Sequence, residues 1–494
     1  MKSRVWLWSI AICLCATLAL SSQLIAQAGP QHHPKHHEYS LYVVGTFGGP
    51  GSDVSYDSIG LTPAGFIGVS ETAMQDPADP NCYLNNCFVG HAFLWRQGHA
   101  IDLGALPGNN GGNTSYAFAI NDSGLVVGNS ENGAVDSQTG YPSISPVAWL
   151  NGHIFNLGGF GGTQGYAAMV NNRGQIVGAS SNTTPDDYGF VQWFPVATQM
   201  RAFLWERGSM HDLGTLGGPD AWATAITDSG LVIGRSFTSN TPNPDNGFPT
   251  LDSFLWDGHR MIDLGSFGGG WSWPGWVNNK GQVVGYSLVP SGVVHAFLWE
   301  HGRLTDIGRP GGYSSGAYWI NEAGAITGFD YAPGPSGAAL WKHGMLTVLG
   351  TLPGYDCAAE GHSLNNAEQV VGEAYTCDGT IHGFLWENGD MVDLNDLVQP
   401  PTDVVVTFPV QIDESGKIAT EVITPSGDIQ AALLIPSGDC GHDCEQRIAE
   451  HRNNPITVNN GLSMPGFGKP ADWLRNPFGL RPGVPSSSGV FLHE

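Results

Sequence analysis

The amino-acid sequence predicts an all-β protein, a β-propeller of about eight four-stranded blades. Three observations lead to this fold class. A strand-like segment that ends in Trp recurs along the chain, each copy is followed by the same turn motifs, and the composition suits short strands joined by tight turns. Gly supplies 70 of the 494 residues and charged residues only 13%, and we find no pattern of a long helix.

The recurring segment reads Ala-Phe-Leu-Trp in its most regular copies, as a strand does. Successive Trp residues lie 42 to 56 residues apart, which is the length of a propeller blade and far from a heptad. The seven copies end at Trp95, Trp149, Trp205, Trp256, Trp299, Trp341 and Trp386.

Two turn motifs follow the Trp segment in most units. The first is Asp-Leu-Gly, which recurs at a regular period. This regularity favours a structural role, in which each Asp bonds backbone groups of its own blade. The alternative is a ring of carboxylates or calcium ligands. The second is Asn-x-x-Gly before Val-Val-Gly, in which Asn caps the turn and Gly takes a positive φ. Each unit is therefore expected to form four antiparallel strands. The repeated Asp residues are Asp102, Asp212, Asp263 and Asp306.

The ends of the repeat region decide the number of blades. We assign residues 42–49 to the first unit, ahead of Trp95, and residues 392–434 to an eighth unit without a Trp. Eight units fit a closed ring over residues 41–436, and seven blades with a cap is the alternative. Because one blade cannot bury both of its faces, loss of one blade is expected to unfold or aggregate the domain.

The combined motifs resemble those of the extracellular HAF repeat family, named for the tripeptide that stands here at residues 91–93 and 295–297. This resemblance implies an exported bacterial repeat protein whose biochemical role is not established, so it carries over no functional residues. The repeats also vary: Arg201 replaces the His of the tripeptide, and Thr227 replaces the repeated Asn. Positions that vary in this way are not expected to be catalytic in every unit.

The chain begins with the three regions of a signal peptide: Lys2 and Arg4, an apolar run over residues 5–20, and the small-residue site at residues 26–28. We predict a signal peptide over residues 1–28, and a retained membrane anchor is the alternative. No second apolar stretch is long enough to span a bilayer. The sequence thus predicts a secreted protein, with the periplasm or the cell surface left open.

Two further segments lie outside the repeats. Residues 437–494 are rich in Pro, Gly, Asn and Ser, and we expect a loosely ordered C-terminal extension. Residues 29–40 form a His-rich segment that can hold zinc, copper or nickel loosely, but we prefer a flexible linker because no strand preorganises it. Its imidazoles belong to His32, His33, His36 and His37.

The cysteines that follow the predicted cleavage site fall into close pairs. An even number in an exported chain indicates disulfides, and local pairing is the simplest arrangement. A zinc clip is the alternative, although each pair lacks nearby ligands to complete it. The pairs are Cys82 with Cys87, Cys357 with Cys377, and Cys440 with Cys444.

The formal net charge of −25 bears on the partners of the protein. It argues against nucleic acid as a ligand, because no basic patch is available to neutralise phosphates. The same charge keeps a secreted protein soluble and favours a monomer. We predict no cofactor and no metal site.

Few residues suggest catalysis. Residues 312–316 match the Gly-x-Ser-x-Gly motif of serine hydrolases, but they lie in a Gly-rich loop between two expected strands, whereas that motif requires a strand followed by a helix. Glu360 and His362 are the irregular charged residues of the seventh unit. We predict no catalytic residue.

Aromatic residues provide the stronger functional lead, because they gather where the units stop resembling each other. Tyr116, Tyr166, Trp222 and Trp273 take equivalent positions in adjacent units and are expected on one face of the ring. Such rings suit stacking on a sugar or gripping an apolar peptide, and packing between blades is the alternative. The predicted ligand site comprises Trp222, Trp271, Trp273, Trp276, Tyr313, Tyr318 and Trp319.

Three functions remain open at this point. The first is a secreted, non-catalytic binding or scaffold protein for an extracellular glycan or protein. The second is a carbohydrate-active hydrolase, in which carboxylates from different blades would converge on the channel. The third is a structural surface or matrix protein.

Overall fold

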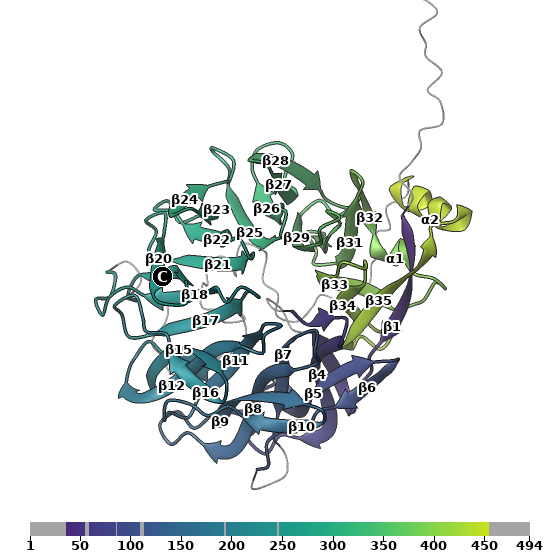
Figure 1. Ribbon diagram of the computed structural model, residues 1–494. Helices are drawn as coiled ribbons and strands as arrows, with labels where there is room; N and C mark the ends of the chain where they lie inside the picture. Colours follow the sequence, from purple (N-terminus) through teal and green to yellow (C-terminus); the bar gives the residue numbers. More distant parts are fainter. Residues whose placement is uncertain are drawn as a thin grey trace, which may run out of the picture. The chain divides into compact units, whose positions relative to one another are not determined.

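The computed structural model describes residues 36–453, except residues 55–58, 85, 109–112, 192–193 and 245–246 and the side chains of residues 191, 194 and 195. The predicted signal peptide, most of the predicted linker and the tail beyond residue 453 lie outside the described residues. The described part forms eight sheets of four main strands, arranged as the blades of a ring (Figure 1). The predicted β-propeller is confirmed, with eight blades.

Blades 1 to 7 are antiparallel meanders, and the first strand of each lies nearest the centre of the ring (Figure 1). Blade 1 consists of β2 (Gly48–Val54), β3 (Leu61–Thr62), β4 (Gly65–Gln75), β5 (Phe88–Arg96) and β6 (His99–Asp102), and blade 2 of β7 (Ser115–Ile120), β8 (Val126–Val135), β9 (Pro142–Leu150) and β10 (His153–Asn156). Blade 3 consists of β11 (Gly165–Val170), β12 (Ile176–Pro185), β15 (Thr198–Glu206) and β16 (Ser209–Asp212), with the hairpin β13 (Phe190–Val191) and β14 (Phe194–Pro195) between β12 and β15.

The later blades follow the same plan. Blade 4 consists of β17 (Ala221–Ile226), β18 (Val232–Phe237), β19 (Leu251–Trp256) and β20 (Met261–Gly265), and blade 5 of β21 (Ser272–Val277), β22 (Val283–Leu288), β23 (Val294–Glu300) and β24 (Arg303–Asp306). Blade 6 consists of β25 (Ser314–Ile320), β26 (Ile326–Tyr331), β27 (Gly337–Lys342) and β28 (Met345–Gly350), and blade 7 of β29 (Ala358–Leu364), β30 (Val370–Tyr375), β31 (Ile381–Glu387) and β32 (Asp390–Asp393).

The eighth blade joins the two ends of the repeat region. It combines β33 (Val405–Ile412), β34 (Ile418–Ile423) and β35 (Ile429–Asp439) with β1 (His37–Val43), which pairs antiparallel to β35 along its length. We expected residues 42–49 to belong to the first unit, and this assignment was wrong for residues 42 and 43, which end β1. Val43 stands where other units have the repeated Asp, so the sequence pattern did not show that this strand closes the ring.

Two short helices pack beside this closing blade. They are α1 (Leu394–Leu397) and α2 (His442–Asn453). We expected a loosely ordered extension from residue 437, but β35 runs to Asp439 and α2 follows. Cys444 and Ile448 are buried in the same apolar cluster as β1 and β35, and a disulfide joins Cys444 to Cys440. The amphipathic pattern of α2 is too short and too polar to be read from the sequence.

All three expected disulfides form as local pairs, namely Cys82–Cys87, Cys357–Cys377 and Cys440–Cys444. None of the helices in the described residues is both long and apolar enough to cross a membrane.

The repeated Asn of the Asn-x-x-Gly turn both caps its own turn and joins two blades. In blade 2, Asn121 Oδ1 accepts hydrogen bonds from the backbone N–H groups of Ser123 and Leu125, at 3.1 and 3.0 Å. Its Nδ2 donates to the carbonyl of Asn171 in blade 3, at 3.0 Å. The same bond to the next blade is made by Asn171, Asn278, Asn321 and Asn365.

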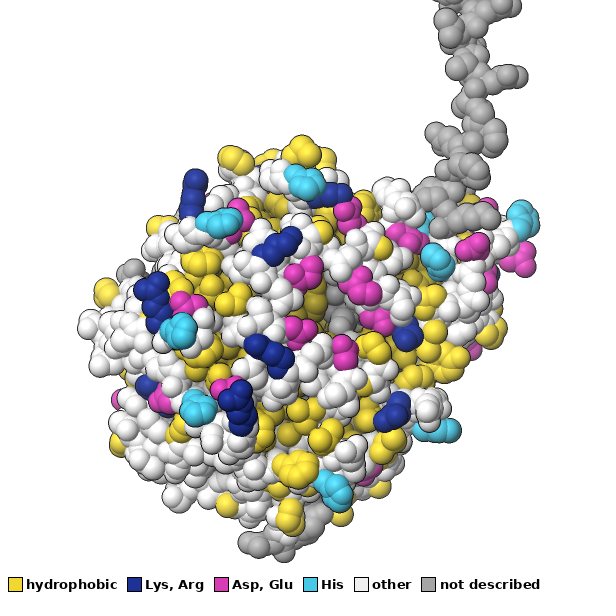
Figure 2. Space-filling model, in the orientation of Figure 1, with side chains coloured by type: hydrophobic (Ala, Val, Ile, Leu, Met, Phe, Trp, Pro, Cys, Tyr) yellow, Lys and Arg dark blue, Asp and Glu magenta, His cyan; other side chains and the backbone are white. Residues whose placement is uncertain are grey.

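A second set of contacts follows one residue later in these turns. Asn172 Nδ2 donates to the carboxylate of Asp122 at 2.9 Å and to that of Asp228 at 3.1 Å. Comparable bonds join Asn279 to Glu322 and Asn366 to Glu414. On the face drawn in Figure 2, acidic side chains surround the central hollow. Much of the acidic and amide character of the turns therefore serves to join the blades.

His36, which directly precedes β1, binds two carboxylates of blade 7. We had expected this residue to lie in a flexible linker. The imidazole is 5% exposed. Its Nδ1 lies 3.0 Å from Glu387 Oε1 and its Nε2 lies 3.1 Å from Asp390 Oδ2. Burial alone would lower the pKa of His36, but the two carboxylates outweigh it and raise the pKa to about 9.

Because of this ion pair, we expect the folded protein to be less stable in alkaline solution. Because the pKa of His36 is higher in the folded chain than its ordinary value of 6.5, the bond contributes fully below pH 6.5 and is lost as the pH rises through about 9. A shift of this size corresponds to about 3 kcal/mol at most. We expect the free energy of unfolding in urea to fall between pH 6 and pH 10 by more in the wild type than in His36→Gln. Equal losses in the two chains would contradict this role.

Candidate functional site

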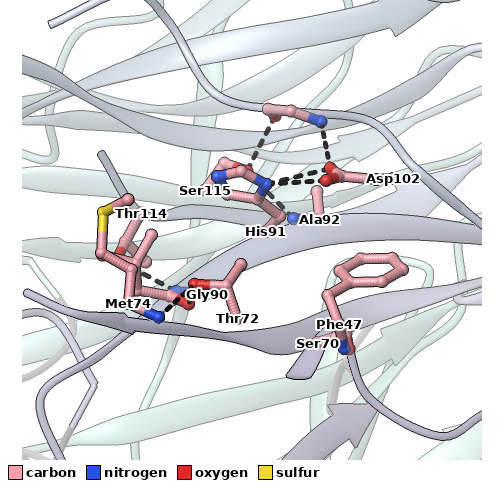
Figure 3. Close-up of polar contacts among 12 residues, drawn as sticks. Phe47, Ser70, Thr72, Met74, Gly90, His91, Ala92, Asp102, Thr114 and Ser115 are labelled. Atoms are coloured by element: carbon pink, nitrogen blue, oxygen red, sulfur yellow. Dashed lines mark hydrogen bonds and ion pairs between the residues drawn. The ribbon is translucent and has the colours of Figure 1, made fainter. Parts of the chain in front are cut away.

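The repeated His and Asp residues form a structural contact within blades 1, 5 and 7. His91 Nδ1 lies 2.9 Å from Asp102 Oδ2, and Asp102 Oδ1 also accepts a hydrogen bond from the N–H of Gly104, at 2.7 Å (Figure 3). Burial would raise the pKa of Asp102, but the bond to His91 lowers it below its ordinary value. In blade 3, Arg201 takes the place of the His and pairs with Asp212 at 3.0 Å. Arg is a permanent cation and cannot act as a general base, so the contact in blade 3 is an ion pair. This replacement indicates that the position has a structural role.

The neighbouring backbone attaches one blade to the next. Ser115, on the first strand of blade 2, accepts a hydrogen bond from the N–H of Ala92 in blade 1 at 2.9 Å, and Thr114 accepts one from Gly90 at 3.3 Å (Figure 3). Ser272 and Ser315 make the same contact in later blades. The residues of the tripeptide thus stabilise the ring.

The Gly-x-Ser-x-Gly match does not form the turn of a serine hydrolase. Ser314 is the first residue of β25, and another strand follows it after a turn. A nucleophile elbow needs a strand that leads directly into a helix, so this segment is part of an ordinary blade.

Three of the predicted aromatic ligand residues lie inside the protein. Trp222, Trp271 and Trp276 are 0%, 6% and 8% exposed. Trp276 stacks on Trp319, with ring centroids 3.9 Å apart and planes at 13°, across the contact between blades 5 and 6. Their rings therefore pack between elements, which was the alternative interpretation.

The remaining predicted residues are accessible to different degrees. Tyr313 is 64% exposed on the loop before β25, whereas Trp273 and Tyr318 are partly buried on the innermost strands of blades 5 and 6. The guanidinium of Arg235 lies over the Trp273 ring, 3.3 Å from its centroid. This cation–π contact fixes one face of the Trp273 ring.

Partly exposed rings continue from blade 5 to blade 8. Tyr286, which pairs with Trp273 across β21 and β22, lies 6.2 Å from Tyr318 between ring centroids. Tyr318 lies 6.0 Å from His362, which lies 4.8 Å from Phe408. We call these five residues the channel arc, because they all lie on the two innermost strands of their blades.

A buried polar cluster in blade 7 adjoins the channel arc. Glu360 and His362 lie on β29, and Glu373 lies opposite on β30. His362 Nε2 is 2.6 Å from Glu373 Oε2, and the hydroxyls of Tyr318 and Tyr331 donate to Glu360 at 2.7 and 3.2 Å. The two carboxylate side chains are almost fully buried.

The surroundings shift the proton affinities of this cluster. Burial, reinforced by the charge of Glu373, raises the pKa of Glu360 to about 7. Burial alone would lower the pKa of His362, but the Glu373 carboxylate outweighs it and raises that pKa to about 9. Burial and the neighbouring carboxylates also raise the pKa of Tyr318 well above its ordinary value. At neutral pH His362 and the Tyr318 hydroxyl therefore keep their protons, whereas Glu360 is close to its pKa.

The sequence indicated only part of this site. Glu360 and His362 stood out as irregular charged residues, and Trp273 and Tyr318 were predicted ligand residues. Glu373, Arg235 and Tyr286 were missed, although a signal was present. All three occupy the position that directly follows the Gly of the Val-Val-Gly element or its equivalent, and comparison of the units at that position finds them.

A separate groove lies at the other ends of the strands, between blades 8, 1 and 2. It encloses about 400 Å³, and its lining includes Leu61, Trp95, Asp122 and Lys417. The groove carries none of the residues of the channel arc.

No protein-family model matches the chain, and no curated protein matches it. Several solved structures are similar in fold. The β-propeller domain of the Trilobed protease from Pyrococcus furiosus is 9% identical, with a TM-score of 0.39, over 66% of this chain and 94% of that one. A puromycin-hydrolyzing peptidase of Mycobacterium tuberculosis is 11% identical, with a TM-score of 0.40, over 78% of this chain and 62% of that one.

An ulvan lyase of polysaccharide lyase family PL25 is 12% identical, with a TM-score of 0.33, over 84% of this chain and 99% of that one. The fold of the present chain is that of a β-propeller, and its candidate site is the channel arc with the adjoining polar cluster of blade 7.

Proposed function

We propose that this protein is a secreted, non-catalytic binding protein that holds a saccharide against the channel arc. The observation that carries the proposal is the continuous series of partly exposed rings from Trp273 to Phe408, placed beside the hydrogen-bonding groups of blade 7. Sugars present apolar C–H faces that stack on aromatic rings, and hydroxyls that bond to carboxylates, imidazoles and phenols.

Two further features support this assignment. The three disulfides suit an exported chain, and the motifs resemble the extracellular HAF repeat family, of which we propose that this chain is a member. The side chains of the arc also differ from one blade to the next, whereas the residues that join the blades repeat.

A glycan array probed with the full chain tests the proposal. We expect binding to a small set of saccharides, and at least about a tenfold loss of affinity in Trp273→Ala and in Phe408→Ala, because removal of a stacking ring costs about 1–2 kcal/mol. Lys280→Ala is the matched control: this exposed side chain lies on the turn after β21, at the opposite end of the same strand as Trp273. Binding that survives both ring variants would refute the arc as the site.

A hydrolase is the second candidate, and one observation favours it. Glu360 and Glu373 each place a carboxylate oxygen within 4.8 Å of the other and of His362, and pairs of carboxylates perform glycoside hydrolysis. Release of reducing sugar from a bound saccharide by the purified protein, abolished in Glu373→Gln, would favour the hydrolase over the binding protein. An array without any bound glycan would favour a structural role.

A further inference from the structure

Three potential metal ligands converge in blade 7. Glu360, His362 and Glu373 each direct one ligand atom to a common space, and these atoms all lie within 4.8 Å of one another. The three side chains come from neighbouring positions of the paired strands β29 and β30, so the backbone register holds them together. A small contraction would bring all three to the distance of about 2.0–2.2 Å at which Zn²⁺ binds nitrogen and oxygen.

The imidazole of His362 is oriented as in a metal ligand. Its Nδ1 lies 3.0 Å from the carbonyl oxygen of Pro409. A carbonyl only accepts hydrogen bonds, so Nδ1 carries a proton, and Nε2 is the atom directed toward Glu373. Metal-binding His residues are commonly fixed in this way, by a bond from the other ring nitrogen to a backbone carbonyl.

Tyrosine hydroxyls hold both carboxylates in place. Tyr318 and Tyr331 donate to the two oxygens of Glu360, and Tyr375 donates to Oε1 of Glu373. Oε2 of Glu373 is thereby left to face His362. Hydrogen bonds of this kind orient ligating carboxylates and sharpen metal affinity.

The cluster buries two acidic side chains against a single imidazole. Glu360 and Glu373 are 3% and 2% exposed, and His362 is the cation that faces them. Burial of charged groups costs several kcal/mol for each ion unless they are well paired. The equivalent positions of blade 5 hold Trp273, Gly275 and Tyr286, so the fold of a blade does not require charge there.

We propose that Glu360, His362 and Glu373 bind one divalent transition-metal ion, of which Zn²⁺ is the best match. A set of one imidazole and two carboxylates suits Zn²⁺ better than Ca²⁺ or Mg²⁺, which prefer oxygen ligands alone. We predicted no metal site from the sequence, in which Glu373 is distant from the other two ligands. This site goes beyond saccharide binding and does not depend on it.

Titration of the metal-free full chain with ZnCl₂, followed by calorimetry and elemental analysis, tests the proposal. We expect one tightly bound Zn²⁺ per chain, at least about a tenfold weaker affinity in His362→Gln and in Glu373→Gln, and a rise of the melting temperature with Zn²⁺ in the wild type only. Tyr375→Phe removes one hydrogen bond to Glu373 and keeps all three ligands. It tests the site even where the ligand variants fold poorly, and we expect it to weaken binding by about tenfold or more.

The His-rich segment provides the matched control. The triple variant His32→Ala, His33→Ala and His37→Ala removes imidazoles outside the site, and we expect it to retain the tightly bound ion. No tight binding by the wild type would overturn the proposal. The proposal would also be overturned if the triple variant lost tight Zn²⁺ binding while His362→Gln, Glu373→Gln and Tyr375→Phe retained it.

Discussion

A chain that begins at Val44, and so lacks β1, is expected not to fold. Loss of β1 would leave β35 as an unpaired edge strand. It would also open the apolar cluster that contains Tyr39, which is fully buried. Loss of one such aromatic side chain costs about 3–5 kcal/mol, and β1 also supplies seven registered residue pairs. Together these losses approach the whole stability of a typical domain, about 5–15 kcal/mol.

Urea unfolding followed by circular dichroism measures this effect. A chain that begins at Gly29 keeps β1 and His36 and is the matched control, which we expect to unfold cooperatively at the wild-type midpoint. A Val44 chain with the same midpoint would show that the ring does not need β1 for closure.

Trp222→Ala is expected to destabilise the protein by about 3–5 kcal/mol. Trp222 is fully buried, packs on Phe237 with ring centroids 5.7 Å apart, and donates its indole N–H to the carbonyl of Phe190 at 3.0 Å. Truncation would leave a cavity and would remove this hydrogen bond.

Trp273→Ala provides the comparison, because Trp222 and Trp273 occupy equivalent positions of adjacent blades. Trp273 is partly exposed, so we expect its loss to change saccharide affinity more than the free energy of unfolding. Denaturant melts and binding titrations of both variants measure the two effects. Equal destabilisation by the two substitutions would contradict the division of these residues into packing and binding roles.

The repeat predicted most of the fold because each motif has a local physical cause. Asn121 caps its own turn, and Asp102 bonds the N–H group two residues later, so both roles could be inferred from short segments. The pairing of β1 with β35 joins opposite ends of the chain, and no local pattern records such a contact. The helix α2 escaped prediction for a related reason, since it is held by contacts with β1 and blade 7.

The candidate site was predictable where a residue stood out in the comparison of the units. Glu360 and His362 were irregular charged residues, and Trp273 belonged to a set of aromatic residues at one equivalent position. The sequence could not tell, however, that Trp276 would stack on Trp319 while Trp273 stayed partly exposed. Exposure depends on how neighbouring blades pack, and that is a property of the assembled ring.

The structure of the full chain in complex with a saccharide selected on the array tests the central claim most directly. We expect the sugar to lie against the channel arc, with a ring stacked on Trp273, Tyr286 or Phe408 and a hydroxyl bonded to the polar cluster of blade 7. A sugar bound instead in the groove lined by Leu61, Trp95 and Lys417 would contradict the claim.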